Sequence, residues 1–160
     1  MLPRVNLYIG AQHTVVSMVN AAQDHASDET PPYLVLELGF EQIANLHFKR
    51  DLPTPLELEC AIETVEDQVV RARSFVAPNT WLASSDANLH EVATAAHGHS
   101  ALPTVITLEE VEHTFNRLAA VSLGRPASSE GLPPSKLFAA TLLILREFMH
   151  HLQCPGLHMS

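Results

Sequence analysis

A short turn near the start of the sequence has the residue types of an anion-binding loop. The segment Gly-Ala-Gln-His-Thr at residues 10–14 separates the apolar runs 5–9 and 15–19, which predicts a strand, a tight turn and a second strand. Backbone N–H groups, the imidazole of His13 and the hydroxyl of Thr14 can all donate hydrogen bonds to an anion. The turn is therefore a candidate phosphate-binding loop, and an ordinary hairpin turn is the alternative.

Ten histidines raise the question of a metal site, and His90, His97 and His99 form the tightest cluster. Zinc sites need three or four converging ligands, usually with cysteine or carboxylate partners. These three histidines are spread over a predicted helix end and a loop, so we expect a solvated loop there. His150 and His151 near the end of the last predicted helix supply a favourable charge at a helix C-terminus.

The two cysteines indicate no special chemistry. They do not make a disulfide framework, and neither Cys60 nor Cys154 stands in a nucleophile signature. Cys60 lies among the apolar positions of a predicted helix, so we expect a core thiol there rather than a reactive one.

Composition and charge limit the kind of partner. The 160 residues fit one domain (1–160) with a single core, and 46% hydrophobic against 17% charged residues is typical of a globular protein. Eighteen acidic and nine basic residues give a formal charge of −9, and the basic residues are scattered along the chain. This balance repels polyanions, so we expect no nucleic-acid partner, and any phosphate ligand needs a local site.

The sequence also predicts the cellular compartment of the protein. The longest apolar run, 137–145, is about half of what a bilayer span needs. The first ten residues, M-L-P-R-V-N-L-Y-I-G, lack the n-region and the long apolar stretch of a signal peptide. We therefore expect a cytoplasmic protein with no membrane partner.

A third strand and a helix follow the opening hairpin. Residues 33–40 read Y-L-V-L-E-L-G-F, which predicts a strand of alternating character. The next helix has a capping box, with Thr54 as N-cap, Pro55 at the first helical position and Glu57 at N3. Its apolar residues recur at helical spacing and form one buried stripe: Leu58, Ile62, Val65 and Val69.

A strand, a turn and two further helices come next. Residues 81–85, W-L-A-S-S, predict a short apolar strand, and Asp86 caps a helix over 87–96. Thr107 and Glu110 form a second capping box that opens another helix.

The last third of the chain completes the predicted order of elements. Residues 124–131 form a loop, Pro133-Pro134-Ser135 starts a last helix, and residues 157–159 add a final edge strand. The order β-β-β-α-β-α-α-α, with this last strand, predicts a mixed α/β fold whose first three strands form a meander.

Several stretches match one known family in order and spacing. The helix start D-L-P-T-P-L-E-L at 51–58 is similar to D-P-P-T-P-x-E-L, and V-L-E-L-G-F at 35–40 is similar to S-L-P-L-G-A-V. I-T-L-E-E-V-E, then N-R-L-A-A-V-S-L, G-L-P-P-S and an apolar helix resemble an L-T-x-E-E-L helix, a G-L-x-P loop and a long final helix. These patterns are those of the exopolyphosphatase and guanosine pentaphosphate phosphohydrolase (Ppx/GppA) family.

The resemblance covers nearly all of the chain and corresponds to the second, C-terminal half of the family's core. It implies an α/β fold of the actin-like ATPase (ribonuclease H-like) type. In that fold we expect a mixed sheet with a β-β-β-α-β-α core and additional C-terminal helices.

The same resemblance implies that the family's catalytic chemistry is missing. Where the family's first strand ends in D-I-G-G-G-S-T, this chain has Y-I-G-A-Q-H-T, so Tyr8 replaces the aspartate of the phosphate and metal site. Side chains at Ala11 and Gln12 crowd a pocket that needs bare backbone. Residues 83–87 stand in place of the family's second glycine turn, G-T-G-G-T, and Asp86 puts a negative charge toward phosphate. The family's first half, with its catalytic glutamate, has no counterpart in this chain.

We therefore expect a catalytically degenerate domain with a binding or regulatory role, no catalytic residues and no cofactor. Its ligand is a phosphate-containing compound or a protein partner. Because a lone half leaves an apolar face uncovered, we also expect a homodimer with a symmetric interface built on the helices. The residues expected to bind phosphate are Gly10, Ala11, Gln12, His13, Thr14, Ser84 and Ser85.

Two alternatives stay open. A weak phosphoanhydride hydrolase, of polyphosphate or guanosine pentaphosphate type, would be completed by dimerisation, with Asp86 or Glu37 holding Mg²⁺ and His13 contacting phosphate. A structural or regulatory subunit without a small ligand is the other alternative.

Overall fold

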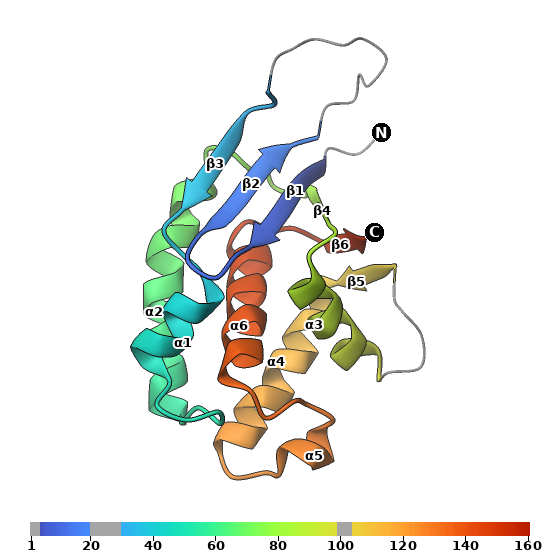
Figure 1. Cartoon of the computed structure of the whole chain (residues 1–160). Coiled ribbons are helices and arrows are strands. Elements are labelled where there is room, and N and C mark those ends of the chain that lie inside the picture. Colours follow the sequence, from blue (N-terminus) through green and yellow to red (C-terminus); the bar gives the residue numbers. More distant parts are fainter. Residues whose placement is uncertain (1–3, 20–29, 99–103) are drawn as a thin grey trace.

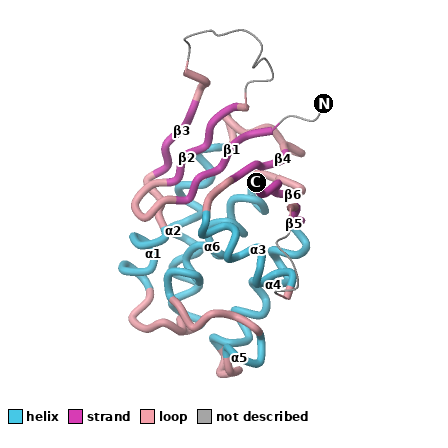
Figure 2. Tube along the Cα trace, turned by 45° about the vertical axis from the view of Figure 1, so that its right-hand side comes forward, coloured by secondary structure: helices cyan, strands magenta, loops and turns pink. Residues whose placement is uncertain are grey.

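Six strands form one mixed sheet with the helices gathered on one side of it (Figure 1). The computed structural model describes residues 4–19, 30–98 and 104–160. A view turned by 45° keeps the strands together above the helices (Figure 2). In chain order the elements are β1 (Arg4–Ile9), β2 (Thr14–Met18), β3 (Tyr33–Leu36), α1 (Phe40–His47), α2 (Pro55–Val69), the 3₁₀ turn η1 (Val70–Ala72), β4 (Trp81–Ser84), α3 (Ala87–His97), β5 (Val105–Thr107), α4 (Leu108–Ser122), α5 (Ala127–Glu130), α6 (Lys136–His151) and β6 (Gly156–Met159).

The strand order β3-β2-β1-β4-β6-β5 combines an antiparallel meander with parallel pairs. β1 pairs antiparallel with β2, with Leu7 opposite Val16, and β2 pairs antiparallel with β3. β4 pairs parallel with β1 on one side and with β6 on the other. The predicted meander is confirmed. Because β1 and β4 are parallel, their carboxyl ends at Ile9 and Ser84 lie at the same edge of the sheet.

One face of the sheet packs against the helices, and the other is open. Along β1, Val5, Leu7 and Ile9 are buried, whereas Asn6 and Tyr8 point the other way and are exposed. This alternation follows from the two-residue period of a strand. Side chains at even positions of β1 are therefore available to a ligand.

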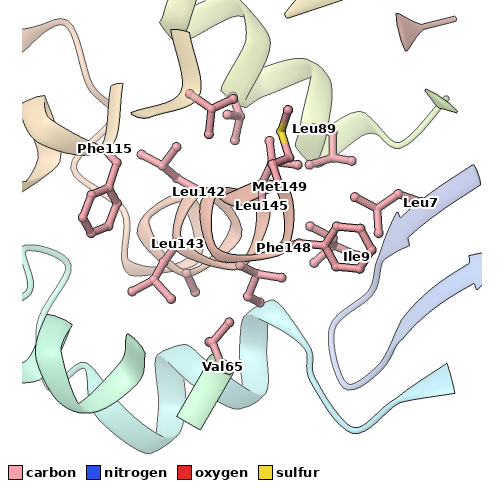
Figure 3. Close-up of a cluster of buried hydrophobic side chains, with 14 of the residues drawn as sticks. Leu7, Ile9, Val65, Leu89, Phe115, Leu142, Leu143, Leu145, Phe148 and Met149 are labelled. Atoms are coloured by element: carbon pink, nitrogen blue, oxygen red, sulfur yellow. The ribbon is translucent and has the colours of Figure 1, made fainter. Parts of the chain in front are cut away.

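The centre of the core is α6, which lies between α1, α2, α3 and α4. Leu142, Leu143 and Phe148 are all fully buried and point in different directions around this helix (Figure 3). A helix that is apolar on every side must be enclosed by other elements, and burying each large side chain contributes about 1.5–3 kcal/mol. None of the helices in the described residues is long and apolar enough to cross a membrane.

Both predicted capping boxes are confirmed. The Thr54 hydroxyl accepts from the Glu57 N–H at 3.2 Å, and the Glu57 carboxylate accepts from the Thr54 N–H at 3.0 Å. Thr107 and Glu110 make the same reciprocal pair at 3.2 and 2.8 Å. The predicted N-cap Asp86 is also confirmed, and the last helix begins after Ser135 as predicted. Each of these side chains accepts from a backbone N–H in the first turn of its helix.

The prediction of one strand over residues 33–40 is wrong. The strand ends at Leu36, and α1 begins at Phe40 after a bend. The N-cap of α1 is Gly39, which has no side chain to accept from the first turn, so only half of a capping box is formed: the Gln42 side chain at N3 accepts from the Gly39 N–H at 3.0 Å.

Three other expectations need correction. The strand over 157–159 exists, but β6 lies between β4 and β5 rather than at the edge of the sheet, because β5 pairs with its outer side. The predicted loop 124–131 contains the short helix α5. Cys60 is exposed on α2 and is not a core thiol.

Candidate functional site

The β1–β2 turn, residues 10–13, is closed onto the start of α1. The Gly10 carbonyl accepts from the Phe40 N–H at 3.0 Å, and the Ala11 carbonyl accepts from the Glu41 N–H at 3.0 Å. The first N–H groups of a helix are the ones that bind anions. Because the turn already uses them, α1 offers no open anion cradle at this point.

Close backbone contact holds this arrangement. A Cβ on Gly39 would lie 2.2 Å from the Ala11 carbonyl oxygen, so glycine is needed for the approach. Gly10 is equally confined, since a Cβ there would lie 2.8 Å from the His13 carbonyl oxygen. Both glycines serve packing between the turn and its surroundings.

Two polar side chains at this turn, Thr14 and His13, have partners within the fold. Thr14 is buried, and its hydroxyl donates to the Leu38 carbonyl at 2.7 Å. His13 Nε2 lies 3.2 Å from Glu37 Oε2, and both side chains are more than half exposed. His13, expected to contact phosphate, and Glu37, expected as a magnesium ligand in the hydrolase alternative, thus face each other.

Asp86 joins the end of β1 to the start of α3. Its Oδ2 accepts from the Ile9 N–H at 3.1 Å, and its Oδ1 accepts from the Asn88 N–H at 2.9 Å. The hydroxyl of Ser84 accepts from the Asp86 N–H at 3.1 Å. Asp86 is only 8% exposed, so its carboxylate is committed to backbone groups on both sides.

A cavity of about 650 Å³, the outer-face cavity, lies where the open face of the sheet meets the start of α3. Its polar lining combines Asn6, Tyr8 and Ser17 from β1 and β2 with the β4–α3 turn, including Ser85 and Asn88. The described lining residues include hydroxyl, amide and carboxylate groups but no lysine or arginine. The start of an eleven-residue helix adds partial positive charge, which the Asp86 carboxylate offsets.

The structure therefore divides the residues predicted to bind phosphate. Ser84 and Ser85 line the outer-face cavity, whereas Gly10, Ala11, Gln12, His13 and Thr14 are not among its described lining residues. Sequence reasoning missed Asn6, Tyr8 and Ser17 as cavity residues. The signal was available in the alternation of β1 and β2, since these residues occupy the positions that point away from the core.

The predicted histidine cluster is split between separate partners. His97 Nε2 lies 3.3 Å from Glu110 Oε1, and His90 Nε2 lies 2.9 Å from the Ser160 carbonyl oxygen. His99 lies outside the described residues. Within the described part of the chain, the residues that converge closely enough for a metal ion are instead Glu66, Glu147 and His151.

The buried cysteine is not set up for catalysis. Burial raises the pKa of the Cys154 thiol to about 12, so the thiol stays protonated at neutral pH. Cys154 is fully buried.

Comparison with known proteins gives a fold and no sequence relative. No family model and no curated protein sequence matches the chain. The fold is similar to that of the type II variant of the Aquifex aeolicus Ppx/GppA phosphatase, with a TM-score of 0.75, 13% identity and coverage of 99% of this chain and 53% of that chain. An exopolyphosphatase from Cytophaga hutchinsonii matches with a TM-score of 0.71, 10% identity and the same coverages, 99% and 53%.

The chain thus spans about half the length of the solved chains that it matches. At this identity the likeness establishes the fold alone, and it confirms the predicted actin-like architecture of a Ppx/GppA half.

Proposed function

We propose that this chain is an exopolyphosphatase-related half-domain that binds a phosphate-containing ligand without hydrolysing it, and that the ligand lies in the outer-face cavity. The likeness in fold to exopolyphosphatases supports the ligand class. The cavity at the start of α3 supports the location, because it holds hydroxyl and amide donors next to a helix N-terminus.

The hydrogen bonding of Asp86 is the observation that carries the non-hydrolytic part of the proposal. Phosphoryl transfer depends on cations that neutralise the developing charge and on a group that positions the nucleophile. Asp86 is the buried carboxylate at the cavity, and both of its oxygens already accept from backbone N–H groups. Releasing it for Mg²⁺ would detach the start of α3 from the end of β1.

Thermal unfolding with and without Mg²⁺, against polyphosphate, guanosine tetraphosphate and ATP, tests the proposal. A ligand at a hundredfold its Kd stabilises by about 2.7 kcal/mol, which raises Tm by about 5–10 °C for a chain of this size. Ser85→Ala removes an exposed cavity hydroxyl and should reduce the shift. Gln12→Ala, in the β1–β2 turn, is the matched control and should leave the shift unchanged.

Three results would change the assignment. A shift lost in Gln12→Ala and kept in Ser85→Ala would move the ligand to the β1–β2 turn. Release of inorganic phosphate above the buffer background would favour the weak hydrolase. The absence of a shift with every compound would refute the small-ligand proposal and leave a protein partner.

We also propose a second copy of the chain as the partner. Leu46 on α1 and Leu56 on α2 are 64% and 67% exposed, more than Tyr8 and Tyr33 on the open face of the sheet at 57% and 61%. Because Tyr8 also lines the cavity assigned to the ligand, the helices are the better candidate for a symmetric interface. Light scattering at tens of micromolar protein checks this, and a strictly monomeric protein would contradict it.

A further inference from the structure

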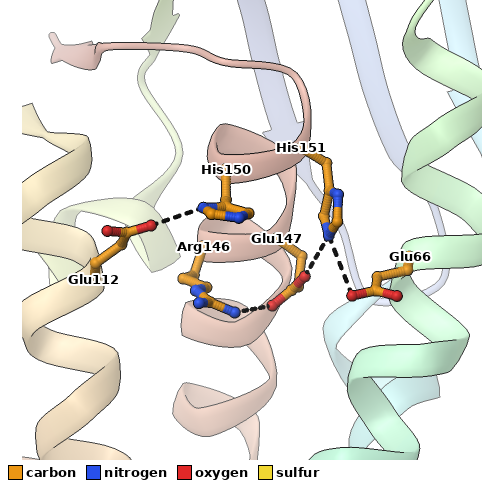
Figure 4. A network of polar contacts seen from close by, with 6 residues as sticks. All are labelled: Glu66, Glu112, Arg146, Glu147, His150 and His151. Atoms are coloured by element: carbon orange, nitrogen blue, oxygen red, sulfur yellow. Dashed lines mark hydrogen bonds and ion pairs between the residues drawn. The ribbon is translucent and has the colours of Figure 1, made fainter.

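Glu66, Glu147 and His151 converge on one point between α2 and α6 (Figure 4). His151 Nε2 lies 3.0 Å from Glu147 Oε2 and 3.2 Å from Glu66 Oε1. Glu147 and His151 are four residues apart, so they share one face of α6. Glu66 projects from α2 toward them, and the three ligand atoms all lie within 4.8 Å of one another.

This triad has more hydrogen-bond acceptors than hydrogens to share among them. Two carboxylate oxygens lie within hydrogen-bond distance of Nε2, which carries at most one hydrogen. When the hydrogen is on Nδ1, the Nε2 lone pair faces both carboxylates. A cation between the three atoms resolves this, because a neutral imidazole and two carboxylates are all donors of electron pairs to a metal.

Burial and the neighbouring arginine favour a preformed site. The Glu147 side chain is 1% exposed, whereas those of His151 and Glu66 are 24% and 40% exposed, so solvent reaches one side of the triad. Arg146 Nη1 donates to Oε1 of Glu147, which leaves Oε2 directed at His151. Ligating carboxylates are commonly oriented in this way by a hydrogen bond to the other oxygen. With a neutral imidazole, the two glutamates and the arginine leave one negative charge in excess.

We propose that Glu66, Glu147 and His151 form a binding site for a divalent transition-metal ion of the Zn²⁺ type, which links α2 to α6. Zinc–ligand distances of about 2.0–2.2 Å imply ligand atoms about 3.3–3.6 Å apart in a tetrahedron, so the 3.0 and 3.2 Å observed would open by a few tenths of an ångström on binding. Imidazole with carboxylates suits zinc or manganese rather than Ca²⁺ or Mg²⁺, which take oxygen ligands. Three protein ligands leave a coordination position for water.

Calorimetric titration of the chelator-treated full chain with ZnCl₂ tests this site. The wild-type protein should bind one equivalent. His151→Gln and Glu66→Gln should each raise the Kd at least about tenfold, the loss seen when even an outer hydrogen-bond partner of a metal ligand is removed. His150→Gln is the matched control, because His150 is the neighbouring histidine and faces Glu112 on α4 at 2.8 Å instead of the triad (Figure 4).

Thermal unfolding of each variant without metal establishes that it folds, and Glu66→Gln is the safer variant because Glu66 is the most exposed of the three ligands. Zinc should then raise the Tm of wild-type protein and of His150→Gln but not of the two triad variants. Two outcomes overturn the inference: no zinc binding by the wild-type chain, or equal affinity in Glu66→Gln, His151→Gln and the control. Neither measurement involves a phosphate compound, so its result is separate from that of the proposed function.

Discussion

Asp86 is the residue at which the structural interpretation can be tested most directly. Its carboxylate accepts one bond from Ile9 and one from Asn88. In Asp86→Asn the amide oxygen can keep the bond from Asn88, since asparagine is a good N-cap. The amide NH₂ group then faces the Ile9 N–H, and a buried donor is left without an acceptor.

The magnitude follows from that one lost acceptor. An unsatisfied buried N–H costs about 1–3 kcal/mol, so Asp86→Asn should lower the free energy of unfolding by about 2 kcal/mol and Tm by about 4–8 °C. Asp86→Ala also loses the cap of α3, which adds about 1 kcal/mol. The expected order of stability is wild type, then Asp86→Asn, then Asp86→Ala.

Urea unfolding followed by circular dichroism measures these differences, and amide exchange of Ile9 reports the broken bond directly. Asp51→Asn is a suitable control, because Asp51 is exposed and its bond from the Lys136 N–H is long, at 3.4 Å. Exposed substitutions of this kind are usually within about 0.5 kcal/mol of wild type. Wild-type stability of Asp86→Asn, or equal stability of the Asn and Ala variants, would refute the reasoning.

Three further predictions concern Gly39 and the cysteines. Gly39→Ala should destabilise by at least about 1–3 kcal/mol in urea unfolding, because its Cβ would lie 2.2 Å from the Ala11 carbonyl oxygen; wild-type stability would show that the turn is not pressed onto α1. A thiol reagent should modify only Cys60 in the native protein and both cysteines in denaturant. The pKa of Cys154 is raised to about 12 in the folded protein and is about 8.5 in the unfolded chain. The free energy of unfolding that depends on this protonated thiol is therefore fully present below about pH 8.5 and is lost between pH 8.5 and pH 12. Over that window stability should fall by up to about 1.4 kcal/mol per pH unit, a slope absent from Cys154→Ala; equal slopes would contradict the raised pKa.

Local hydrogen bonding explains which elements the sequence predicted well. Thr54 with Glu57, and Thr107 with Glu110, are partners only three residues apart, so the residue types alone indicate where α2 and α4 begin. The apolar positions of α2 also recur at helical spacing, and the short turn at residues 10–13 favours antiparallel pairing of β1 with β2. These features need no knowledge of the rest of the chain.

The start of α1 shows why other elements were missed. Its first N–H groups find their acceptors on Gly10 and Ala11, in a turn that precedes the third strand. The local signal is weak, because the N-cap Gly39 has no side chain and only Gln42 at N3 completes its half of a capping box. Likewise β6 is internal only because β5 pairs with its outer side.

The amino-acid sequence by itself determined the starts of α2 and α4, the periodic apolar positions of α2 and the resemblance in motif order to the Ppx/GppA family. Only the tertiary structure decided that Ser85 and Asn6 line the same cavity and that Glu66 contacts His151, 85 residues away in the sequence. The physical reason is the separation along the sequence of the residues that interact. Caps and periodicity depend on neighbours within one or two turns, whereas a binding site depends on how distant segments cross in the packed core.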